Sequence, residues 1–269
     1  GARLANRVVP RFRPVPWGWV FCCPKLRVRG IMSTINSAEY VELKQAIYRE
    51  YSRSYDEDRQ RFVSAESLLR RIQWALEPLS PGQRLLDLGC GSGELLLEAH
   101  RQIGGVGVLA GLDLSPEMLS LARVRADSVA SLVQGNSLDG LPFQDGSFHL
   151  VTSLNLLQEL PRFAIQPLLE QVRKVLKPGG YFRAVIPCKA DRSPASQAFQ
   201  KLARDNGAME FWWPEELEDL LTNIPGFTQQ EFRVAASTAA SAAAGGKPVS
   251  SSLPGWRKKS AVAVWTRTK

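Results

Sequence analysis

The chain has 269 residues, 44% hydrophobic and 22% charged, which is an ordinary globular composition with enough length for one sizeable core. No apolar run approaches the roughly 20 residues that a membrane-spanning helix needs, so we expect a soluble protein without a membrane span. The four cysteines, two of them adjacent, have no spacing typical of a disulfide framework or a zinc site, so we expect no metal and favour a reducing compartment.

The net charge of +8 is concentrated in residues 1–31, which carry seven Arg and Lys residues and no acid. The rest of the chain is nearly neutral and gives no electrostatic reason to expect a nucleic-acid partner. We expect residues 1–31 to be a basic extension outside the fold, either an artefact or part of an organelle-targeting extension, with an RNA-binding arm as a third choice. The expected location is cytoplasmic, or a plastid or mitochondrion if the extension is a targeting segment.

Residues 32–79 are predicted to form helices that cap the functional site. From 38 to 62, apolar and aromatic residues recur at spacings of three and four, which marks one face of an amphipathic helix. A second helix is predicted from about Ser64 to Glu77. The Tyr-rich face of the first helix either packs on the core or roofs a ligand pocket. Its members are Tyr40, Leu43, Ile47, Tyr48, Tyr51 and Tyr55.

From residue 80 to residue 269, strand-like apolar runs alternate with helix-compatible segments. Such alternation predicts parallel strands joined by helical crossovers, and hence a doubly wound α/β sheet. The segments "QQEFRVA" and "SAVAVWTRTK" look like closing antiparallel strands, separated by a low-complexity insertion near 235–255. The runs that start the sheet lie at 84–88, 108–112, 130–134, 148–154 and 181–186.

The stretch "LLDLGCGSGE", residues 85–94, follows the first predicted strand, where ligands of such sheets bind. Gly89, Gly91 and Gly93 let the chain turn sharply, let a ligand approach the backbone and let the next helix start close to the sheet. The loop fits a dinucleotide site, a nucleoside site without phosphates, or a tight structural turn.

Two acids separate these alternatives. Asp113 ends the second predicted strand, 20 residues beyond Gly93, where a carboxylate can accept both hydrogen bonds of a ribose diol. Asp87 stands just before the glycines, where it would repel a pyrophosphate but would suit an ammonium group. S-adenosylmethionine has that ammonium group, a ribose and no phosphate, so the nucleoside site is favoured.

The chain resembles the class I S-adenosylmethionine-dependent methyltransferases, in the type 11 group similar to ubiquinone and menaquinone methyltransferases. The resemblance covers most of residues 80–230 in the family's order. It implies a Rossmann-like, mostly parallel seven-stranded sheet with an antiparallel closing strand, and S-adenosylmethionine as cofactor. The matching pieces are "LLDLGCGSGE", "GLDLSPEML", "VQGNSLDGLPFQDGSFHLV", "LLEQVRKVLKPGGYF" and "WWPEELEDLLTNIPGF".

The resemblance also implies the cofactor-binding residues. The first group is the glycine loop, Asp87, Gly89, Cys90, Gly91 and Gly93, where Asp87 and the backbone would hold the methionine part.

Asp113 would bind the ribose, Leu114 and Met118 would flank the adenine, and Asn136 with Ser137 would lie beside the adenine amino group. Leu154 and Asn155 would lie close to the sulfonium. Asn136 departs from the commoner Asp, but its amide oxygen can accept the same hydrogen bond.

The sequence names no catalytic residue. Methyl transfer from a sulfonium is a direct displacement that needs a base only if the acceptor must lose a proton. Gln158 and Glu159 stand where many relatives show paired histidines, and Glu159, Tyr51 and Tyr55 are candidates for the acceptor side.

We expect a small, partly apolar acceptor, because the predicted roof is Tyr-rich, Trp212 and Trp213 are present, and the domain is neutral. The alternatives are a nucleic-acid (RNA) methyltransferase that uses the basic tail, a non-catalytic cofactor-binding member, and a nucleotide-dependent oxidoreductase. The sequence predicts no oligomeric state.

Overall fold

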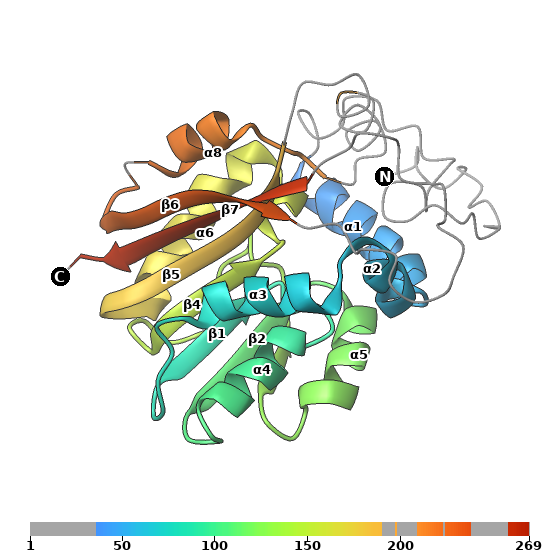
Figure 1. Ribbon diagram of the computed structural model, residues 1–269, viewed down its shortest axis with the longest axis horizontal. Helices are drawn as coiled ribbons and strands as arrows, with labels where there is room; N and C mark the ends of the chain where they lie inside the picture. Colours follow the sequence, from blue (N-terminus) through green and yellow to red (C-terminus); the bar gives the residue numbers. More distant parts are fainter. Residues whose placement is uncertain (1–35, 190–196, 198–208, 223, 238–257, 269) are drawn as a thin grey trace.

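The computed structural model describes residues 36–189, 197, 209–222, 224–237 and 258–268. Residues 1–31 and most of the predicted 235–255 insertion lie outside the described residues. Seven strands form one sheet in the order β3-β2-β1-β4-β5-β7-β6, and β7 runs antiparallel to both of its neighbours (Figure 1). This confirms the predicted doubly wound, mostly parallel sheet. The strands are β1 (Arg84–Leu88), β2 (Val108–Asp113), β3 (Ser131–Gln134), β4 (Phe148–Leu154), β5 (Leu176–Cys188), β6 (Phe227–Ser237) and β7 (Lys258–Arg267).

Helices cover both faces of the sheet. In Figure 1, α3, α4 and α5 lie on one face and α6 and α8 on the other. Successive side chains of a strand point to opposite faces of the sheet. Leu85 packs on the face that α3, α4 and α5 cover, whereas Leu86 and Leu88 pack on the face that α6 covers. The helices are α1 (Ser37–Tyr51), α2 (Tyr55–Phe62), α3 (Ala65–Leu76), α4 (Glu94–Gln102), α5 (Pro116–Ala126), α6 (Arg162–Val175) and α8 (Pro214–Leu221).

The single helix predicted over 38–62 is wrong, because the structure divides it into α1 and α2. Serines at the break bond to nearby groups: Ser52 Oγ donates to the Arg49 carbonyl, and Ser54 Oγ donates to the Asp58 carboxylate at 2.7 Å. Such local bonds compete with continued helix, and acids in the first turn of α2 favour a new start. None of the helices in the described ranges is long and apolar enough to cross a membrane.

Gly111 in β2 makes room for the glycine loop to lie against the sheet. A β-carbon there would come within 2.7 Å of Leu96 Cδ1 and 2.8 Å of Cys90 Sγ. We therefore expect Gly111→Ala to destabilise the protein by about 1–3 kcal/mol through overpacking. Urea denaturation measures this, with the exposed Ser131→Ala on the neighbouring strand as control. Equal stability of the two variants would show that the loop can shift without loss.

Candidate active site

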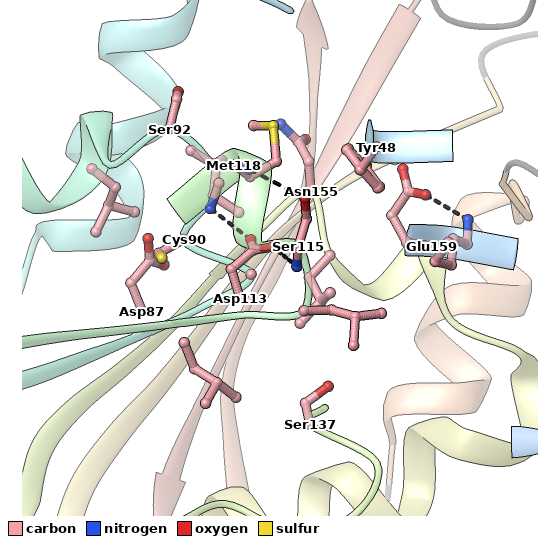
Figure 2. A pocket seen from close by; sticks show the side chains of 18 of the residues that line it. Tyr48, Asp87, Cys90, Ser92, Asp113, Ser115, Met118, Ser137, Asn155 and Glu159 are labelled. Carbon is pink, nitrogen blue, oxygen red and sulfur yellow. Dashed lines mark hydrogen bonds and ion pairs between the residues drawn. The ribbon is translucent and has the colours of Figure 1, made fainter. Parts of the chain in front are cut away.

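A cavity lies at the carboxyl ends of β1, β2 and β4, with α1 and α2 contributing to its wall (Figure 2). The structure brings most of the predicted cofactor residues together there. Gly93 instead packs against α5, where an added β-carbon would lie 3.2 Å from Ala122 Cα. The sequence predicts that this glycine lets the next helix start close to the sheet, and its close neighbours lie on α5 instead. The predicted residues in the lining are Asp87, Gly89, Cys90, Gly91, Asp113, Leu114, Met118, Asn136, Ser137, Leu154 and Asn155.

The glycine loop turns over the end of β2. The backbone N–H groups of Gly89 and Cys90 both donate to the Leu112 carbonyl, at 2.8 and 3.1 Å. Gly89 and Gly91 have φ values of 68° and 52°, the left-handed region that favours glycine. A β-carbon on Gly89 would also lie only 3.1 Å from Leu156. The loop backbone is therefore held against the cavity by turns that larger residues would strain.

The Asp113 carboxylate is fixed by two backbone amides. Gly91 N–H donates to Oδ2 at 2.8 Å and Ser115 N–H donates to Oδ1 at 2.9 Å (Figure 2). Burial raises the pKa of this carboxyl despite those bonds. Each carboxylate oxygen has lone pairs for more than one donor, so both oxygens can still accept hydrogen bonds from a ligand.

Asp87 is almost completely buried, with an exposed fraction of 2%. The Thr152 hydroxyl donates to its Oδ1 at 2.8 Å. Burial raises the pKa of Asp87 to about 7, the Thr152 bond opposes that rise, and the charge of Asp113 adds to it. A cationic ligand group in the cavity would stabilise the ionised form of this carboxyl.

Two asparagines in the lining carry buried polar atoms without a partner among the described residues: Asn136 Nδ2 and Asn155 Oδ1. Asn136 Oδ1 accepts the Leu138 N–H at 3.1 Å, which orients the amide. The unpartnered group of Asn136 is thus the donor Nδ2, whereas we expected its oxygen to act as an acceptor, and that oxygen already accepts one bond. Asn155 has φ 61°, a left-handed conformation rare for a residue with a side chain.

The wall that α1 contributes contains a buried ion pair. Lys44 Nζ lies 2.7 Å from Glu159 Oε2, with side-chain exposures of 2% and 8% (Figure 2). The Tyr40 hydroxyl donates to the Glu159 carbonyl at 3.1 Å, and Tyr48 lines the same region. The aromatic pattern alone did not single out Lys44. Its position did indicate a place on the same helix face, because Lys44 lies four residues after Tyr40 and four before Tyr48.

Ion pairs tie α2 to the glycine loop and to α5. Arg59 on α2 pairs with Glu94, the first residue of α4, at 2.6 Å. Arg125 on α5 pairs with Asp56 and also donates to the Ser92 carbonyl at 3.1 Å. These contacts were not predicted, because charges far apart in the sequence give no spacing signal. They hold α2, which supplies Tyr55 and Arg59 to the lining, over the loop.

Some of the candidates for the acceptor side line the cavity and others do not. Glu159 and Tyr55 line the cavity. Tyr51 is buried and is not part of the lining, and its ring centroid lies 5.2 Å from that of Tyr55. Trp212 packs in the hydrophobic core, and Trp213 lies beneath the Lys189 ammonium at 5.2 Å.

Comparisons with known proteins identify relatives of this chain. A family model described as a methyltransferase domain matches residues 85–180. The chain is 32% identical over 178 residues to the 2-phytyl-1,4-naphtoquinone methyltransferase of Synechococcus elongatus, covering 63% of this chain and 74% of that protein.

Solved methyltransferases share the fold. One, in complex with the Haloferax volcanii Trm112 methyltransferase activator, is 21% identical, with a TM-score of 0.60 over 84% of this chain and 97% of that one. A geranyl diphosphate methyltransferase in complex with GPP and sinefungin is 18% identical, with a TM-score of 0.56 over 76% and 78%. The sequence match to a relative over most of its length, together with this fold, shows that the chain belongs to the class I S-adenosylmethionine-dependent methyltransferases.

Proposed function

We propose that this chain binds S-adenosylmethionine and transfers its methyl group to a small, partly apolar acceptor of the quinone class. The observation that carries the proposal is the Asp113 carboxylate, fixed at the end of β2 by the N–H groups of Gly91 and Ser115. A carboxylate held by both oxygens is preorganised to accept hydrogen bonds from the two hydroxyls of a ribose. Its side chain therefore loses little conformational freedom on binding. Asp113 is therefore the ribose-binding residue of the proposal.

The methionine part would lie along the glycine loop beside Asp87. A buried carboxyl whose pKa is about 7 lacks a cationic partner in the described structure, and an ammonium group supplies one. The unpartnered Asn155 Oδ1 is a second acceptor in the same cavity, suited to a positively charged region of the ligand. Both features favour a ligand with positive charge over one with a pyrophosphate.

The adenine would lie between Leu114 and Met118, beside Asn136 and Ser137. Asn136 offers its Nδ2 donor, which fits a ring nitrogen of adenine better than the adenine amino group. Met118 is buried and polarizable, which suits contact with an aromatic base. This arrangement keeps the predicted residues but changes the expected bonding partner of Asn136.

When bound, S-adenosylmethionine would supply a methyl group on a sulfonium sulfur, and the sulfur is the leaving group when a nucleophile attacks the methyl carbon. The residues of the chain hold donor and acceptor in line and exclude water. Leu154 and Leu156, at the end of β4 and just beyond it, place apolar side chains in the lining. Fixing two reactants in attack geometry can supply much of the acceleration of such a step.

Two observations support the proposed acceptor class: the residues that α1 contributes to the cavity wall, and the name of a similar methyltransferase. Tyr40 and Tyr48 present aromatic rings to the cavity, and Leu160 adds an apolar contact. The relative from Synechococcus elongatus is named for a naphthoquinone with a phytyl chain. An apolar ring compound therefore fits the wall better than a charged polymer does.

Binding of S-adenosylhomocysteine tests the cofactor part of the proposal. We expect this ligand to raise the melting temperature, because binding only to the folded state stabilises it by about 2.7 kcal/mol at a hundredfold excess over the dissociation constant. NADH at the same concentration is expected to leave the melting temperature unchanged. Differential scanning fluorimetry compares the two ligands. A shift with NADH alone, or no shift with saturating S-adenosylhomocysteine, would contradict the cofactor assignment.

A further inference from the structure

Glu159 presents a buried carboxylate to the cavity from the short 3-10 helix η2 (Leu157–Glu159), which follows β4. Lys44 Nζ holds its Oε2 at 2.7 Å. Its other oxygen, Oε1, is buried and accepts no hydrogen bond of good geometry from the residues that the structure describes, although the Tyr48 hydroxyl lies close enough to lower the pKa of the carboxyl. Figure 2 shows Glu159 on the side of the cavity where Tyr48 lies, apart from Asp87. One carboxylate oxygen is thus committed and the other is available.

A buried carboxylate with one unmet acceptor is an expensive arrangement for a fold to maintain. Buried polar atoms in proteins nearly always have partners, and each exception calls for an explanation. A buried ion pair contributes little net stability compared with well-packed apolar residues. Since Glu159 lines the cavity, a ligand donor is the partner that would satisfy Oε1.

We propose that the methyl acceptor binds in its reduced, quinol form, and that Glu159 accepts a hydrogen bond from a ring hydroxyl of this quinol and takes its proton during methyl transfer. This rests on the proposed function. The acceptor O–H bond breaks and the proton goes to Oε1. The electron pair left on the acceptor oxygen forms the bond to the methyl carbon, and the methyl–sulfur bond breaks with its electron pair remaining on sulfur. Lys44 is the positioning residue, because it holds Oε2 and turns Oε1 toward the acceptor.

The charges around Glu159 suit this role. Burial raises the pKa of its carboxyl, while the Lys44 ammonium and the Tyr48 hydroxyl oppose the rise. Tyr40 of α1 and Asp113 of β2 face the same region, since Glu159 raises the pKa of both. A carboxylate with a raised pKa is a better base, and Lys44 favours the ionised form in which it can act.

A matched pair of ligands tests the hydrogen bond. With S-adenosylhomocysteine saturating, calorimetry compares 1-naphthol with 1-methoxynaphthalene, which has the same ring but no O–H. We expect the native chain to bind 1-naphthol about 10-fold more tightly or better, as a hydrogen bond to a charged group predicts. In Glu159→Gln the amide oxygen stays with Lys44 and an N–H replaces Oε1, so the preference is lost. Glu98→Gln, which removes a partly exposed carboxylate paired with Arg101 on α4, should keep it.

Equal affinity of the native chain for the two ligands would overturn the inference, and so would a preference that survives in Glu159→Gln. A lack of S-adenosylhomocysteine binding by the native chain would instead overturn the proposed cofactor, and the two ring ligands would still decide the role of Glu159. Lys44→Met/Glu159→Gln removes both charges of the pair. It serves as the second variant if Glu159→Gln alone fails to fold, as judged by circular dichroism.

Turnover tests the proton transfer. With S-adenosylmethionine and 1,4-naphthoquinol, Glu159→Gln is expected to lose about 100- to 10,000-fold in rate at neutral pH. The loss should shrink as the pH rises, because the acceptor hydroxyl then ionises without a base. A variant rate within threefold of the native rate would overturn the catalytic role. No turnover by the native chain would count against the quinone class alone, and the binding comparison would then decide the inference.

Discussion

Asp87→Asn is expected to make the folded protein more stable and a weaker binder of S-adenosylhomocysteine. Burial raises the pKa of Asp87 from 3.8 to about 7, so folding favours its neutral form. Stability from this group is therefore fully present below about pH 4 and is lost as the pH rises to 7. The shift corresponds to about 4 kcal/mol at pH 8. Asparagine never ionises and keeps the shape that fits beside Thr152.

Urea denaturation at pH 5 and pH 8 measures the first half of this prediction. The stability gain of Asp87→Asn should be larger at pH 8 than at pH 5, and the exposed Asp139→Asn should show no such gain. Calorimetry measures the second half. Loss of a charge-assisted hydrogen bond to the ligand ammonium group should weaken binding about 10- to 150-fold. A variant that is less stable at pH 8 would mean that the Asp87 charge is compensated within the protein.

The native chain should also lose affinity for S-adenosylhomocysteine as the pH falls below 7. Binding to an ammonium group requires the ionised form of Asp87, whose pKa in the unliganded protein is about 7. The dissociation constant should therefore rise about tenfold per pH unit below that value, until the pKa of the complex is reached. Titrations from pH 5 to pH 8 measure this, and Asp87→Asn should give a flatter profile.

Much of the sheet could be predicted from the sequence because its signals are local. A buried parallel strand reads as an apolar run, and β1 and β4 have the predicted bounds 84–88 and 148–154. The glycine loop could be interpreted for a related reason. Three glycines, an acid before them and a second acid after the next strand form a pattern within about 30 residues.

Other features depend on contacts between distant segments and have no such pattern. The Lys44–Glu159 pair joins α1 to the end of β4, and a lysine within an aromatic stripe looks like an exposed residue until the fold buries it. The bonding of Asn136 depends on Leu138 turning its N–H back toward the side chain. The break between α1 and α2 depends on serine hydroxyls that can serve either a helix or a turn.

Asp113→Ala is expected to weaken S-adenosylhomocysteine binding far more than Asn136→Ala does. Asp113 can make charge-assisted hydrogen bonds to two ribose hydroxyls, each contributing roughly 1.5–3 kcal/mol. With water compensating for part of this, a loss of about 2–3 kcal/mol corresponds to roughly 30- to 150-fold in dissociation constant. Asn136 offers one neutral donor, Nδ2, which contributes about 0.5–1.5 kcal/mol, or up to roughly tenfold.

Isothermal titration measures the loss of affinity in each variant, with circular dichroism as the folding control. Asp113 also accepts the Gly91 and Ser115 amides, so alanine removes a support of the loop as well as a ligand contact. Asp113→Asn separates the two effects, because its amide oxygen can still accept one backbone N–H while its charge is gone. The dissociation constant of Asp113→Asn for S-adenosylhomocysteine should therefore lie between those of the native chain and Asp113→Ala. If Asp113→Ala binds within about threefold of the native chain, a difference below 1 kcal/mol, the ribose lies elsewhere.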